Sequence, residues 1–170
     1  MRGKYDGFIT LSETAEHPAG RDLPWIAWLS GTEGLQNYYS LHWNMEKPAA
    51  PADAPRAVGH PPHKHKETEL IFLCGTDPAD PYDLGAEVEI SFGPEMERHV
   101  IRRSCCIRIP PDTPHGFYNI NWCTRPFLFI AVQEANPPTE KFLWEYLTRE
   151  EIDSMPPEVR AFWQDKGYDD

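Results

Sequence analysis

The stretch from His63 to Glu69 holds the residues with the clearest capacity for chemistry, two histidines followed by a glutamate. Side chains alternate across a β-strand with a period of two, so His63, His65 and Glu69 point to one side of an extended chain. Two imidazoles and a carboxylate on one face suit a divalent metal ion. The segment 63–73 is therefore predicted to be one strand that presents a metal site.

A second stretch, residues 110–119, offers one more histidine after a proline-rich turn. The turn leads into an apolar strand and would deliver His115 beside the first group, so His115 is the candidate fourth ligand. Tyr118 follows three residues later and is the candidate catalytic acid or base. Its parity is opposite to that of His115, so it reaches the same side only if a β-bulge intervenes.

The order and spacing of these residues resemble the two sequence motifs of cupins. The matching residues are His63-x-His65-x3-Glu69-x5-Gly75 for the first motif and Pro110-x4-His115-x3-Asn119 for the second. Ala57 and Asp112 stand where cupins carry glycines, and the gap between Glu69 and Gly75 is one residue short. These departures affect turns and leave the four ligand positions intact.

The resemblance implies an all-β fold, the double-stranded β-helix or jelly-roll barrel of cupins. Carried over residue by residue, it implies that one divalent transition metal binds to His63, His65, Glu69 and His115. The metal could be iron, manganese, zinc or nickel. The resemblance further implies a small-molecule substrate or ligand and, because cupins often pair through their sheets, a homodimer.

The expected chemistry follows from this ligand set. Three neutral imidazoles and one carboxylate leave a divalent ion with net positive charge and open coordination positions. Such positions can hold water, dioxygen or a bidentate substrate. A metal-dependent enzyme is expected, with an Fe(II)-type dioxygenase favoured over a non-redox isomerase, lyase or decarboxylase. The alternative from another class is a non-catalytic sensor of a small ligand.

The elements that would position the site read as short strands separated by turns rich in proline and glycine. The chain has 18 prolines among 170 residues, which argues against an all-helical fold. Alternating or apolar runs predict strands at 25–29, 38–45, 63–73, 86–92, 99–101, 105–109, 117–122 and 126–132. Strands at this spacing indicate an antiparallel sandwich or barrel.

The chain divides into three predicted parts. Residues 1–20 form an irregular lead-in with a short strand at 8–11, and residues 21–135 form the barrel. Residues 136–170 form a tail with two short helices packed on the barrel. Thr148 and Glu151 have the spacing of a capping box, and Pro157 stands near the start of the second helix.

Further residues are assigned by strand parity. Ile71, Leu73 and Phe117 share the parity of the ligands and are expected to line the pocket, with Trp43 from a neighbouring strand. Parity leaves open whether Trp43 or the adjacent His42 faces inward. The remaining candidates are Glu67, as a hydrogen-bond partner of a ligand, and two histidines expected to face solvent, His60 and His99.

Composition excludes several functions. The net charge of −11 repels phosphate backbones and anionic lipid, so neither nucleic acid nor membrane is an expected partner. The sequence has no long apolar run and no export signal, which predicts a cytoplasmic protein. The four cysteines lack the CxxC spacing of a zinc finger or thioredoxin-like site.

Overall fold

The computed structural model describes residues 24–51 and 58–168. The predicted lead-in at 1–20, with its strand at 8–11, lies outside these residues. Ten strands form within them: β1 (Trp25–Leu29), β2 (Tyr38–Asn44), β3 (His63–Lys64), β4 (Glu69–Cys74), β5 (Asp83–Phe92), β6 (Glu97–Arg103), β7 (Cys105–Ile109), β8 (His115–Cys123), β9 (Phe127–Gln133) and β10 (Lys141–Phe142).

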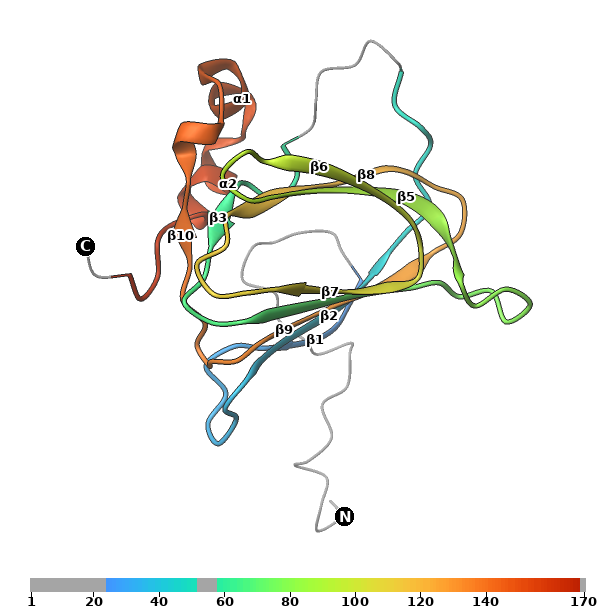
Figure 1. Cartoon of the computed structure of the whole chain (residues 1–170), viewed down its shortest axis with the longest axis horizontal. Coiled ribbons are helices and arrows are strands. Elements are labelled where there is room, and N and C mark those ends of the chain that lie inside the picture. Colours follow the sequence, from blue (N-terminus) through green and yellow to red (C-terminus); the bar gives the residue numbers. More distant parts are fainter. Residues whose placement is uncertain (1–23, 52–57, 169–170) are drawn as a thin grey trace.

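The strands form two antiparallel five-stranded sheets that face each other (Figure 1). One sheet has the order β1-β2-β9-β4-β7, and the other has the order β10-β3-β8-β5-β6. From β2 onward the chain crosses repeatedly between the sheets, and only β5 and β6 follow one another within one sheet. Two sheets wound together in this way form a jelly roll. The predicted double-stranded β-helix is therefore confirmed.

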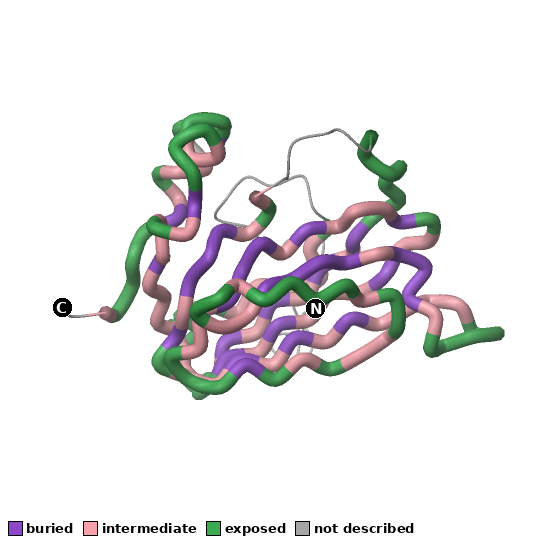
Figure 2. Tube along the Cα trace, turned by 45° about the horizontal axis from the view of Figure 1, so that its top comes forward, coloured by how far each residue is buried: buried purple, intermediate pink, exposed green. Residues whose placement is uncertain are grey.

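Alternation of side chains builds the core between the sheets. Along β4, every second residue is buried and the residues between are partly exposed, and Figure 2 shows the same alternation along neighbouring strands. This is the pattern of strands that have one face turned to a core. The inward apolar residues form one cluster: Ile71, Leu73, Leu84, Ala86, Val88, Ile90, Ile109, Cys123, Phe127 and Ala131.

The segment predicted as a single strand over 63–73 is two strands that belong to different sheets. β3 ends at Lys64, the chain bends at residues 66–67, and β4 begins at Glu69. At the bend, the backbone N–H of Lys66 donates to Thr139 Oγ1. The prediction of one continuous strand was wrong because the chain must cross here from one sheet to the other.

The C-terminal segment contains a 3-10 turn (Trp144–Tyr146) and two short helices, α1 (Arg149–Ser154) and α2 (Pro157–Phe162). The predicted capping box is present, with Thr148 and Glu151 each accepting from the backbone N–H of the other. The segment also supplies β10, which pairs with β3. No helix among the residues described here has the length and apolar character needed to cross a membrane.

Candidate metal centre

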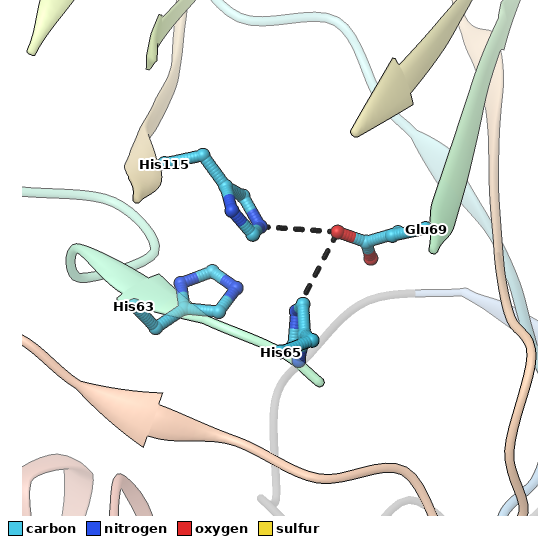
Figure 3. A group of neighbouring side chains, drawn as sticks. All are labelled: His63, His65, Glu69 and His115. Carbon is cyan, nitrogen blue, oxygen red and sulfur yellow. Dashed lines mark hydrogen bonds and ion pairs between the residues drawn. The ribbon is translucent and has the colours of Figure 1, made fainter. Parts of the chain in front are cut away.

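Four side chains from separate parts of the sequence converge at one end of the barrel. His63 belongs to β3, His65 follows it, Glu69 begins β4 and His115 begins β8. All four residues are buried, with exposed fractions of 1–7%. One potential ligand atom from each lies within 4.8 Å of those from the others. Figure 3 shows the three imidazoles and the carboxylate turned toward a common point.

The glutamate already contacts two of the histidines. Glu69 Oε2 lies 3.1 Å from His115 Nε2 and 3.6 Å from His65 Nε2, as the dashed lines in Figure 3 indicate. The imidazole of His63 lies against that of His115, with ring centroids 4.2 Å apart. These spacings are those of ligands that could surround a single ion.

The second nitrogen of each imidazole is fixed by a backbone carbonyl group. Nδ1 of His63, His65 and His115 lies 2.8, 2.6 and 2.9 Å from the carbonyl oxygens of Pro61, Thr139 and Thr113, respectively. A carbonyl oxygen can only accept, so each Nδ1 must carry the proton and donate it. When the ring is neutral with its proton on Nδ1, Nε2 carries the lone pair that a metal needs, which is the usual arrangement around metal-binding histidines.

The electrostatics of the metal-free site are dominated by the buried carboxylate. Burial opposes ionisation of Glu69, but its contacts with the imidazoles of His115 and His65 hold its pKa well below the usual range. Burial and the neighbouring imidazoles lower the pKa of His63 well below its ordinary value. Burial also disfavours the charged form of His65, but the hydrogen bond and charge of Glu69 outweigh it and raise the pKa of His65. The site therefore keeps Glu69 ionised and His63 neutral.

This donor set fits a divalent transition metal. Three imidazole nitrogens and one ionised carboxylate supply borderline and hard ligands to one buried point. The structure brings together all four residues predicted from the sequence. Their assignment as ligands stays a prediction, which analysis of the bound metal can test.

Gln133 is a neighbour of the site that sequence reasoning missed. Its side chain is buried, and its Nε2 lies 2.8 Å from His65 Nε2. On β9 it pairs with Glu69 of β4, which explains its position beside the carboxylate. The only signal in the sequence is that an apolar strand ends on a polar residue.

A β-bulge in β8 reverses the parity that was used to assign Phe117 and Tyr118. Gly116 and Phe117 adopt φ angles of 153° and 51°, and the pairing with β5 shifts register between Glu89 and Ser91. Phe117 consequently packs into a second cluster outside the barrel, with Leu147 and Met155, so its assignment as a pocket-lining residue was wrong.

The same bulge turns Tyr118 into the barrel. Its ring centroid lies 5.2 Å from that of Phe129, and the side chain packs against the main core. Its hydroxyl is buried and finds no hydrogen-bond partner among the described residues. Burial raises the pKa of Tyr118 far above its ordinary value, so the phenol stays protonated and can donate a hydrogen bond but cannot act as a base.

The other predicted lining residues divide between the two faces of the first sheet. Ile71 and Leu73 face inward on β4, beyond Glu69. On β2 the inward position belongs to His42, which is 7% exposed and stacks on Phe129, whereas Trp43 lies on the opposite face. The assignment of Trp43 as a lining residue was wrong because its strand presents the even-numbered residues to the interior.

The two histidines expected in solvent differ from one another. His99 is exposed on β6, as predicted. His60 is half-buried, and its Nδ1 lies 3.2 Å from Nδ1 of His63. The prediction for His60 was wrong because the chain before β3 runs alongside β8, where His60 forms a bridge to Tyr118.

Comparison with known proteins finds solved structures of low similarity to this chain. No protein-family model and no curated protein matches the chain. An uncharacterized double-stranded β-helix protein from Klebsiella pneumoniae has a TM-score of 0.46 at 12% identity, covering 84% of this chain and 96% of its own. Recombinant oxalate oxidase in complex with glycolate has a TM-score of 0.48 at 16% identity, covering 94% of this chain and 74% of its own.

A third similar structure is Peruvianin-I, described as a cysteine peptidase from Thevetia peruviana latex. Its TM-score is 0.48 at 15% identity, and the match covers 83% of this chain and 80% of that chain. Similarity at this level carries no information about activity or substrate. The sheet topology places this chain in the class of double-stranded β-helix (jelly-roll) proteins, and the order of its two motifs resembles that of cupins.

Proposed function

We propose that this protein is a metal-dependent cupin enzyme that acts on a small polar organic molecule, and that it is an Fe(II)-dependent dioxygenase. One observation carries the proposal: a buried cluster of three imidazoles and one carboxylate in which every imidazole turns Nε2 inward. A purely structural cluster would have no need to bury four ionisable groups together, because burial of such groups is costly.

Each residue of the site would have a distinct role. His63, His65, Glu69 and His115 would hold the ion, and their carbonyl partners would keep the lone pairs directed at it. A divalent ion held in this way would supply a Lewis acid with positions for substrate and, in the case of iron, the capacity to react with dioxygen. Neutral imidazoles and an ionised Glu69 are the protonation states that binding requires.

The inward face of β2 supports a polar substrate. Its four inward residues are all buried and can all form hydrogen bonds: Tyr38, Ser40, His42 and Asn44. Two strands away in the same sheet, the inward residues of β4 beyond Glu69 are apolar, namely Ile71 and Leu73. Two small residues, Ser40 on β2 and Ala131 on β9, pair with each other across neighbouring strands. Ala131 also pairs with Ile71, the next inward-facing residue of β4 after Glu69. A small molecule with hydroxyl or carboxyl groups along one edge would place that edge toward the polar residues of β2 and its other edge toward the apolar residues of β4.

Tyr118 receives no role in this proposal. Its ring packs on Phe129, and Cys105 and Cys123, the groups near its hydroxyl, lie at the ends of their strands away from Glu69 and His115. Its raised pKa also excludes a general base.

Oxygen consumption tests the proposal. The protein would be reconstituted anaerobically with Fe²⁺ and mixed with oxygen and a panel of small hydroxy and carboxylic acids. We expect substrate-dependent oxygen uptake that is lost in His115→Ala. Turnover of a panel compound without oxygen uptake would contradict the dioxygenase and favour a non-redox isomerase or lyase. Stoichiometric iron without turnover of any compound in the panel would favour a ligand-binding sensor.

A further inference from the structure

The backbone carbonyls that orient the three histidines differ in origin. Pro61 and Thr113 each precede their own histidine by two residues. Thr139, whose carbonyl accepts from His65 Nδ1, lies 74 residues away in the C-terminal segment. The orientation of His65 therefore depends on how firmly a distant part of the chain is docked beside it.

Thr139 is held in place by the bend that separates β3 from β4. Its backbone N–H and its hydroxyl both donate to Glu67 Oε2, at 3.2 and 2.7 Å. The same hydroxyl accepts from the backbone N–H of Lys66 at 2.9 Å. The hydroxyl thus uses donor and acceptor together, and the carbonyl beyond it is left to receive the proton of His65.

The next residue, Glu140, is connected to a second ligand residue, His63, through His60. Glu140 Oε1 lies 3.8 Å from His60 Nε2, and His60 Nδ1 lies 3.2 Å from His63 Nδ1. The ring of His60 also packs on Trp163, with centroids 4.3 Å apart. Glu140 is in turn anchored by Lys166, whose Nζ donates to it at 3.0 Å.

The backbone completes the attachment. β10 pairs with β3 so that Phe142 stands opposite His63, and the N–H of Leu143 donates to the carbonyl of Pro62 (Figure 1). Residues 139–143 therefore lie at the edge of the sheet, beside His63 on β3 and beside His65, which follows that strand.

We infer that Thr139, held by Glu67, is a positioning residue of the metal centre, and that the C-terminal segment is part of the site. The inference rests on the proposed function, because it requires His65 to be a ligand. It assigns Thr139 no contact with metal or substrate. Thr139 acts through the Nδ1–H of His65, which sets the direction of Nε2.

Titration with Co²⁺ alone tests the inference in the full-length protein. Thr139→Val keeps the shape of the side chain and removes both bonds of the hydroxyl, and Thr139→Ser restores the hydroxyl. Thr124→Val is the matched control, because the Thr124 hydroxyl donates to the Gly85 carbonyl near the far end of β8. The readouts are Co²⁺ affinity and the visible absorption spectrum of the bound ion, which reports its ligand geometry.

We expect Thr139→Val to weaken Co²⁺ binding by about 10-fold or more and to alter the spectrum, as loss of such indirect support typically does. Thr139→Ser should recover both, and Thr124→Val should change neither. Wild-type affinity and spectrum in Thr139→Val would overturn this inference alone. Failure of the wild-type protein to bind Co²⁺ would overturn the metal centre and the inference together.

A second variant covers the case in which Thr139→Val does not fold. Glu67→Ala removes the carboxylate that anchors Thr139 and leaves the threonine itself in place. The same loss of affinity and the same spectral change are expected, and wild-type values for both would contradict the inference.

Discussion

His63, His65 and His115 each form a hydrogen bond from Nδ1 to a backbone carbonyl oxygen. This hydrogen bond fixes the direction of each ring, and in the neutral ring also its tautomer, before a metal ion binds. Glu69 adds the single negative charge, and its contacts with His65 and His115 keep it ionised although it is buried. At the scale of residues, the site is therefore preorganised for a cation.

The pKa of His65 leads to a prediction about proton release. Because Glu69 raises this pKa in the metal-free protein, His65 holds a proton at higher pH than an ordinary histidine. A metal requires the neutral ring, so binding must displace that proton at about pH 6.5 and displaces progressively less of it as the pH rises. Metal affinity should accordingly rise with pH and level off once His65 is neutral.

Calorimetry of Co²⁺ binding measures this release. At about pH 6.5, the observed enthalpy should depend on the ionisation enthalpy of the buffer, and this dependence should fade as the pH rises. Equal enthalpies in all buffers at that pH would show that His65 is already neutral there.

At this scale the sequence predicted what is encoded locally. The ligand candidates sit in two short motifs, so their spacing was sufficient to find them. Gln133 and Thr139 reach His65 from 68 and 74 residues away, and only the fold brings them there. The direction of Tyr118 depended on a bulge that parity alone could not reveal.

At the scale of elements, the bulge at the start of β8 decides which side chains enter the barrel. It depends on Gly116, whose φ of 153° is rarely adopted by other residues. A Cβ at this position would lie 2.5 Å from Pro62 Cα, an atom of the backbone that cannot easily move. The segment before β3 therefore packs directly on the bulge.

Gly116→Ala is predicted to destabilise the fold by about 2 kcal/mol or more, from backbone strain and overpacking together. Gly34→Ala is the matched control, because Gly34 also has a positive φ, 81°, but a Cβ added there would meet no atom within 4 Å. Urea unfolding of both variants measures the difference. Equal losses of stability would show that the contact with Pro62 is not restrictive.

Strand existence was predictable and strand continuity was not. An alternating run predicted β5 and a continuous apolar run predicted β9, and both strands form. The alternation continued through residues 63–73, although the chain changes sheets at the bend. The bend depends on hydrogen bonds to Thr139, which no local pattern encodes.

At the scale of the whole molecule, the site lies where both sheets and the C-terminal segment meet. β3 and β8 belong to one sheet, β4 belongs to the other, and residues 139–143 lie beside His63 and His65. An ion bound here would join parts of the chain that otherwise share few interactions. Metal binding should therefore stabilise the whole fold.

Removal of metal is predicted to lower the Tm of the protein. At a free metal concentration about 100 times Kd, binding to the native state alone contributes about 2.7 kcal/mol. Thermal unfolding with and without a chelator measures this effect. His115→Ala should unfold at the same temperature in both conditions, and a chelator effect of wild-type size in that variant would place the ion elsewhere.

The jelly-roll fold was predictable from the order of the two motifs within a chain of short strands, and the sheet topology agrees with this prediction. The contribution of the C-terminal segment did not follow. Its helices were recognisable from Thr148 and Pro157, but β10 has only two residues and depends on pairing with β3.

The central claim is that His63, His65, Glu69 and His115 bind one divalent metal. Elemental analysis of protein purified anaerobically tests it most directly, with His65→Ala beside the exposed control His99→Ala. We predict about one equivalent of metal, iron in the favoured case, in wild type and in His99→Ala, and only a small fraction of that in His65→Ala. Equal metal content in wild type and His65→Ala, or no metal even after reconstitution, would contradict it.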